Sequence, residues 1–146
     1  MHYDKGDYDT AFKYLKKAAE LGDAPAHYEL SIIYRKGEGS VEKDEKKKIY
    51  HLEVAAIQGH PKARICLGAH ERYINNNLDR AVKHFIIAAN LGLDSAMKEL
   101  KDCYKGGAIS KDDFAAALRA HHAAVNETKS PQREAAARAV AAGVGF

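Results

Sequence analysis

The sequence predicts an all-α fold, a right-handed α-solenoid of stacked antiparallel helix pairs, and three observations indicate this class. Ala-Ala pairs recur along the chain, and a glycine stands three residues after the second alanine of three of them. A second signature, an alanine and a leucine four residues apart, recurs beside the first. Ala, Leu, Lys and Glu, which favour helix, are plentiful, and the chain has only 3 prolines. Such repetition is typical of one small helical unit stacked several times.

The two signatures advance together. Successive Ala-Ala pairs lie 37, 33 and 35 residues apart, and the Ala-Leu signature advances by the same 37 and 33 residues. Two markers that share the same irregular spacing indicate a true repeat. The spacing varies because the loops differ in length, which costs little stability. The markers are Ala18-Ala19, Ala55-Ala56, Ala88-Ala89 and Ala123-Ala124, with Ala26 and Leu30, Ala63 and Leu67, and Ala96 and Leu100.

Each unit contains two helical patterns joined by a tight turn. In one pattern Ala26, Leu30 and Ile33 lie on a single stripe of a helix. Gly22 follows the preceding Ala-Ala pair and can take the left-handed conformation that ends a helix. Asp23 then begins the next helix. The sequence predicts helices at about 8–21, 24–36, 44–58, 61–73, 78–91, 94–105 and 111–126, then an Ala-rich helix with Ser130 as N-cap and Pro131 at its first position.

The first helix, YDTAFKYLKKAAELG, has the pattern of the second member of a pair. Without a first member it would expose an apolar flank, so we expect the chain to be the C-terminal part of a longer array. The sequence at the C-terminal end departs from the repeat pattern, which is typical of a terminal cap. The predicted division is 1–22 as the second helix of an incomplete repeat, 23–59 as repeat 1, 60–92 as repeat 2, 93–127 as degenerate repeat 3, and 128–146 as a capping helix and tail.

Residues 26–60, AHYELSIIYRKGEGSVEKDEKKKIYHLEVAAIQGH, resemble a Sel-one-like repeat (SLR), a relative of the tetratricopeptide repeat. The family pattern is roughly AxYxLGxxYxxGxGVxxDxxKAxxWYxKAAxxG, and this stretch fits it once Ser40 is treated as an insertion. Residues 61–92 match more weakly, and the later sequence drifts. His51 and His84 stand where the pattern has Trp. The resemblance implies an adaptor that presents a concave surface to other proteins.

Composition and charge exclude several other classes of protein. A net charge of +3, from 23 basic and 20 acidic residues, is too small to indicate nucleic-acid binding by itself. The apolar runs are far shorter than the roughly 18–20 residues that span a bilayer, and the N-terminus lacks a signal-peptide pattern. Cys66 and Cys103 form no CxxC motif, and the cysteine pairs of the disulfide-bonded repeat enzymes are absent. We expect a cytoplasmic protein, in which the sequon at Asn126 has no role.

The candidate binding residues lie on the first helices of the pairs, away from the packing stripe. In the related tetratricopeptide arrays these positions line the inner groove, and the resemblance places their counterparts here in the same way. Arg35, Arg72 and Lys105 are equivalent, so we expect them to form a basic ladder. Such a ladder beside apolar anchors suits an acidic peptide or a C-terminal carboxylate. The predicted partner-binding groove consists of Tyr28, Ile32, Arg35, Ile65, Arg72, Tyr73, Lys98 and Lys105.

A second explanation of the ladder stays open. All three basic residues occupy the last turn of their predicted helices, where the helix dipole favours a cation by about 0.3–1 kcal/mol. The charged segment EKDEKKK at 42–48 mixes signs, which is typical of a solvated surface. Aromatic residues interleaved for base stacking are missing from it. We therefore expect no nucleic-acid partner.

The motifs of metal sites and active sites are missing or incomplete. Cys66 and His70 are four residues apart on one predicted helix, a geometry that can hold a metal, but two ligands are too few. Asp112 and Asp113 follow Ser110 where a helix begins, so capping explains these carboxylates better than acid–base catalysis. No phosphate loop, nucleophile elbow or dinucleotide fingerprint is found. We expect neither enzymatic activity nor a cofactor.

The sequence thus predicts a non-enzymatic adaptor or scaffold that binds a peptide or a partner surface in its concave groove. An alternative is a structural spacer, the C-terminal part of a larger multidomain protein whose chemistry lies upstream. The unpaired first helix adds a third arrangement, a homodimer formed through the open N-terminal end. No membrane partner is expected.

Overall fold

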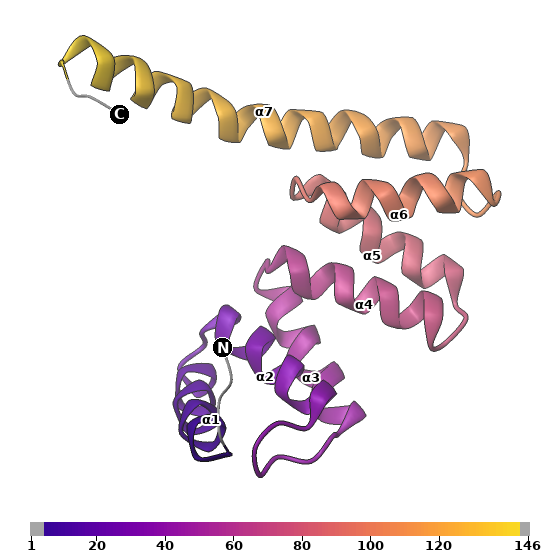
Figure 1. Ribbon diagram of the computed structural model, residues 1–146. Helices are drawn as coiled ribbons and strands as arrows, with labels where there is room; N and C mark the ends of the chain where they lie inside the picture. Colours follow the sequence, from indigo (N-terminus) through magenta and orange to yellow (C-terminus); the bar gives the residue numbers. More distant parts are fainter. Residues whose placement is uncertain (1–4, 144–146) are drawn as a thin grey trace. The chain divides into compact units, whose positions relative to one another are not determined.

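The computed structural model describes the backbone of residues 5–143 and the side chains of residues 6–127 and 135–143. This part of the chain contains seven α-helices and no strand (Figure 1). The chain divides into two compact units, with the boundary between His84 and Phe85. The helices are α1 (Lys5–Glu20), α2 (Ala24–Lys36), α3 (Glu45–Ile57), α4 (Pro61–Tyr73), α5 (Leu78–Asn90), which contains the unit boundary, α6 (Asp94–Lys105) and α7 (Lys111–Ala141).

The predicted helix bounds agree closely with the structure except at the last helix. We predicted that one helix ends near residue 126 and that another begins after Ser130. This was wrong, because α7 stays helical through Ser130 and Pro131, whose side chains lie outside the described part. An internal proline costs a helix about 3 kcal/mol, but the Ala-rich and charged residues on both sides favour helix. The predicted boundary of a separate cap therefore does not coincide with a helix end.

The Ala-Ala-x-x-Gly motif ends a helix each time it occurs. Gly22, Gly59 and Gly92 have φ values of +90°, +91° and +89°. At the first of these turns the amide of Gly22 donates to the carbonyl of Ala19 over 2.9 Å, and that of Asp23 to Ala18 over 3.1 Å. The same two bonds close the other two turns. This is a left-handed helix cap, and it confirms the role predicted for the motif.

Side-chain caps begin five of the described helices, among them α5, where Asn77 Oδ1 accepts from the backbone amide of Arg80 over 3.2 Å. His60 accepts a hydrogen bond from the backbone amide of Ala63 through Nδ1 over 3.2 Å. At α6 the N-cap is Leu93, which makes no side-chain bond, and Asp94 is instead the first helical residue. The backbone amides two or three residues into α2, α3 and α7 donate to the side chains of Asp23, Asp44 and Ser110.

The predicted packing stripe is buried in both units. In the first unit, helix α2 packs against α1 and α3, and α3 packs against α4. In the second unit, α6 packs against α7 (Figure 1). On α2, Tyr28, Ile32 and Arg35 lie off this stripe and are half-buried or exposed, so they remain available for binding. The stripe residues are Ala26 (2% exposed), Leu30 (1%), Ala63 (0%), Leu67 (6%), Ala96 (0%) and Leu100 (0%).

The loop between α2 and α3 is attached to α1 through Ser40. Its amide and its hydroxyl donate to the two carboxylate oxygens of Asp9 over 2.8 and 2.7 Å. The residue that interrupts the family pattern thus links the loop to the neighbouring helix.

Candidate functional site

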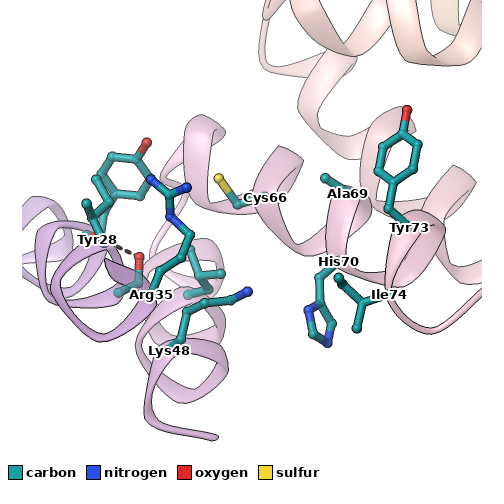
Figure 2. A pocket seen from close by; sticks show the side chains of 11 residues that line it. Tyr28, Arg35, Lys48, Cys66, Ala69, His70, Tyr73 and Ile74 are labelled. Atoms are coloured by element: carbon teal, nitrogen blue, oxygen red, sulfur yellow. Dashed lines mark hydrogen bonds between the residues drawn. The ribbon is translucent and has the colours of Figure 1, made fainter. Parts of the chain in front are cut away.

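A pocket of about 430 Å³ opens between α2, α3 and α4 in the first unit (Figure 2). Ile32 and Leu52 are among its aliphatic lining residues. Tyr73 and Ile74, at the C-terminal end of α4, remain 61% and 65% exposed. Figure 2 shows Arg35 on the opposite side of the opening from Tyr73. The surface is therefore apolar, concave and accessible.

Four of the eight predicted groove residues line this pocket, namely Tyr28, Ile32, Arg35 and Tyr73. Two others, Ile65 and Arg72, belong to the same unit but are not among its lining residues. The guanidinium carbon of Arg72 lies 5.0 Å from the ring centroid of Tyr73. The remaining two, Lys98 and Lys105, are exposed residues of the second unit. A ladder of three cations along one groove stays a prediction.

The pocket also contains residues that were not included in the predicted groove. Lys48 and Leu52 come from α3, whereas the prediction considered only the first helix of each pair. Cys66 and His70 line the pocket together, as their spacing of four residues on one helix face would have indicated. The other three of these seven residues are Ser31, Ala69 and Ile74.

One carboxylate faces two of the pocket's nitrogen-bearing side chains. Glu45 Oε1 lies 3.0 Å from Lys48 Nζ and 3.2 Å from His70 Nδ1. The side chain of Lys48 is 13% exposed and that of Glu45 is 59% exposed, so solvent screens this ion pair from the side of the carboxylate. Among the described residues, Arg35 has no carboxylate partner. The pocket therefore carries one guanidinium whose charge is not offset by an ion pair.

The wall formed by Tyr28 and Cys66 is neutral at physiological pH. Burial raises the pKa of the Cys66 thiol, and Arg35 only partly opposes this shift. Burial also raises the pKa of Tyr28, whose ring stacks on His60 at a centroid distance of 4.6 Å. A thiol with a raised pKa is a poor nucleophile. Cys66 therefore contributes contact area to this wall.

A second polar cluster joins α1, α2 and α3. His27 Nε2 lies 3.1 Å from the carbonyl oxygen of Ala19, and His27 Nδ1 lies 2.9 Å from His51 Nδ1. A carbonyl can only accept, so Nε2 of His27 donates, and His51 Nδ1 donates when both rings are neutral. His51 also stacks on Tyr34 at 5.6 Å. Burial and the nearby charge of His27 lower the pKa of His51 to about 4.

The next repeat forms the same contact with different residues. Arg64 donates to the carbonyl of Ala56 over 3.2 Å, and another of its nitrogens lies 3.4 Å from His84 Nδ1. In the two repeats His51 and His84 occupy the position at which the family pattern has Trp. Hydrogen bonds thus connect helices where the pattern expects a large aromatic side chain.

Neither Cys66 nor Cys103 is part of a disulfide. No set of 3 or more His, Cys, Asp or Glu side chains gathers as metal ligands within the part of the chain that the structure describes. Among its described helices, none combines the length and the apolar character needed to cross a membrane.

Comparison with known proteins places the repeats in a family. A family model described as Sel1 repeat matches residues 3–23, 24–60 and 67–93. An uncharacterized protein of Neisseria meningitidis serogroup B is 33% identical over 117 residues, which are 80% of this chain and 24% of that protein.

Two crystal structures have a similar fold. One is a protective antigen present in uropathogenic Escherichia coli strains, which displays an SLR fold; it matches with a TM-score of 0.64 and 28% identity over 76% of this chain and 25% of that chain. The other is a Sel1 repeat protein from Oxalobacter formigenes, with a TM-score of 0.61 and 26% identity over 76% of this chain and 46% of that one. The chain thus spans less than half the length of these proteins.

The fold class predicted from the sequence, an α-solenoid of helix pairs, is that of the solved relatives. The family model covers more than half of the chain, and its second match, 24–60, contains both helices of the best-fitting pair. This chain belongs to the Sel1 repeat family.

Proposed function

We propose that this chain is a non-enzymatic adaptor that binds a partner peptide or protein surface in the pocket between α2, α3 and α4. Sel1 repeats generally serve as scaffolds for protein interactions. The observation that carries the proposal is the concave apolar surface at which Tyr73 and Ile74 stay 61% and 65% exposed. Exposed apolar surface that is hollowed and rimmed by polar side chains is typical of an interaction site.

Tyr28, Ile32 and Tyr73 act as the anchors, because aromatic and aliphatic side chains in the centre of an interface contribute most of the binding energy. Arg35 attracts anionic partners from the rim, where a charge alters the rate of association and the salt dependence more than the affinity. The outer part of the proposed groove in this unit consists of Ile65 and Arg72.

Helix α1 supports a second proposal, a homodimer formed at the N-terminal end. Tyr14 on this helix and Leu21, the residue after its end, are 75% and 84% exposed. Tyr14 is one repeat of 37 residues before His51, which α2 covers through Tyr34 and His27. The equivalent side of α1 would bind the corresponding helix face of a second copy.

Selection from a displayed library of random peptides tests the adaptor function. The wild-type chain is compared with Tyr73→Ser and with the triple variant Arg35→Ala, Arg72→Ala, Lys105→Ala, at low and high salt. We expect the wild type to enrich peptides that Tyr73→Ser loses and that the triple variant retains less well. Failure of the folded wild type to enrich any peptide would support the spacer alternative.

A further inference from the structure

We propose that the pocket recognises one large aliphatic side chain of a partner polypeptide together with a single adjacent carboxylate, and that it does not select for an acidic tract. This inference rests on the proposed adaptor function and specifies what the same pocket binds. It differs from the basic ladder, which would attract several negative charges along an extended groove.

The first argument is the distribution of charge around the pocket. Lys48 and His70 both face Glu45 Oε1, at 3.0 and 3.2 Å. This carboxylate already offsets the Lys48 ammonium, so Lys48 attracts little further negative charge. Arg35 is the lining cation without a carboxylate partner among the described residues. Arg72 lies over the ring of Tyr73 and outside the lining. The pocket can therefore pair with one anionic group.

The second argument is the identity of the remaining lining. Ile32 and Leu52 approach from α2 and α3, and Ala69 and Ile74 from α4 and the residue after it. The volume of about 430 Å³ is near the lower end of the range of about 300–1,000 Å³ that ligand clefts occupy. A pocket with this aliphatic lining has room for a large aliphatic side chain.

The third argument is the placement of the two chemistries. Figure 2 shows Arg35 beside Tyr28 on one side of the opening, with Ala69 and Ile74 across from it. A carboxylate at the Arg35 side leaves the adjoining aliphatic chain pointing towards Ala69. A planar guanidinium can bind both oxygens of a carboxylate at once, which fixes this orientation.

Two sources can supply such a carboxylate, the side chain of Asp or Glu and the C-terminus of a polypeptide. Hexanoate contains the shared chemistry in its smallest form, an aliphatic chain that ends in a carboxylate. Hexanamide has the same shape without charge, and hexylammonium has the opposite charge. These three probes separate recognition of the anion from recognition of the apolar chain.

The test is to titrate the full chain with each probe and to monitor binding by the chemical shifts of the backbone amides. Hexanoate should shift the amides around Ile32, Arg35 and Ala69 with a dissociation constant in the millimolar range, as expected for so small a ligand. Arg35→Gln should weaken hexanoate binding about tenfold, because charge-assisted bonds are lost. Lys83→Gln, which removes a positive charge at an exposed residue of α5 outside the pocket lining, should leave binding unchanged.

Equal binding of hexanamide and hexanoate would overturn the inference, and so would an unchanged hexanoate affinity in Arg35→Gln. If library peptides bind while hexanoate shifts no amide at the pocket, this inference fails and the adaptor function stands. If hexanoate does bind at the pocket, enriched peptides synthesised with free and with amidated C-termini distinguish the two sources of the carboxylate. Dependence on the free terminus assigns the C-terminus, and equal binding assigns an acidic side chain.

Discussion

His27 and Arg64 occupy the same position in successive repeats, 37 residues apart, and make the same contact. Each bonds the carbonyl of the second alanine in the preceding Ala-Ala pair, over 3.1 and 3.2 Å. Each also contacts the histidine at the Trp position of the family pattern, His51 or His84. Burial lowers the pKa of both of these histidines, His51 and His84. We therefore expect acid to weaken both of these contacts between helices, which we call the His27–His51 and Arg64–His84 joints.

The His27–His51 joint predicts a pH dependence of stability. Burial, His27, Lys16 and Lys47 lower the pKa of His51 from 6.5 to about 4 in the folded chain. The unfolded chain then binds more protons between these values, so the free energy of unfolding falls as the pH drops from about 6.5 to 4. His60 and His84, whose pKa values burial also lowers, add to the same trend.

Urea unfolding at several pH values checks this prediction with His51→Gln. We expect the variant to lose less stability than the wild type as the pH falls through that window. His122→Gln, at the exposed neighbour of a buried histidine, is the matched control and should keep the wild-type slope. Parallel slopes for His51→Gln and the wild type would show that this joint does not sense acid.

At the scale of the elements, the helix ends could be predicted from the sequence, but the ionic contacts beside the pocket could not. A turn that needs positive φ selects glycine, so Gly22 and Gly59 mark helix ends by residue type alone. The ion pair of Lys48 with Glu45, and the approach of His70 to the same carboxylate, depend on how α3 packs against α4. Periodicity within one helix contains no information about such contacts.

Gly59→Ala tests the helix-ending motif. An added Cβ would have no neighbour within 4 Å, so steric crowding from other residues is excluded. With φ at +91°, alanine should lower the free energy of unfolding by about 1 kcal/mol through backbone strain alone. Gly106→Ala is the control, because Gly106 has a φ of −81°, and the replacement should change stability little. Equal effects in the two variants, measured by urea unfolding, would contradict this explanation.

At the scale of the whole molecule, the repeat period predicted the fold class and the resemblance of residues 26–60 predicted the family, while the division into repeats and a cap stays a prediction. Family and fold depend on signatures that recur in every unit, such as Ala26 with Leu30, and these are visible without any coordinates. The end of the last repeat depends on where α7 stops, and its sequence gave a false signal at Pro131. Strong helix formers on both sides of a proline explain that error.

The exposed side of α1 predicts self-association that depends on concentration. Tyr14→Lys would introduce a charge at a residue that is 75% exposed and should weaken a homodimer while leaving the monomer folded. Tyr50→Lys, at a tyrosine of α3 that is 57% exposed, is the control. Sedimentation equilibrium measures the effect. A wild type that stays monomeric at high concentration would exclude this arrangement.

The central claim is that partners bind in the pocket between α2, α3 and α4, and mapping an enriched library peptide onto the chain by amide chemical shifts tests it most directly. The claim predicts shifts concentrated at Ile32, Arg35, Lys48 and Ala69, and their loss in Tyr73→Ser. Shifts confined to α7, or a peptide footprint that Tyr73→Ser leaves unchanged, would contradict it.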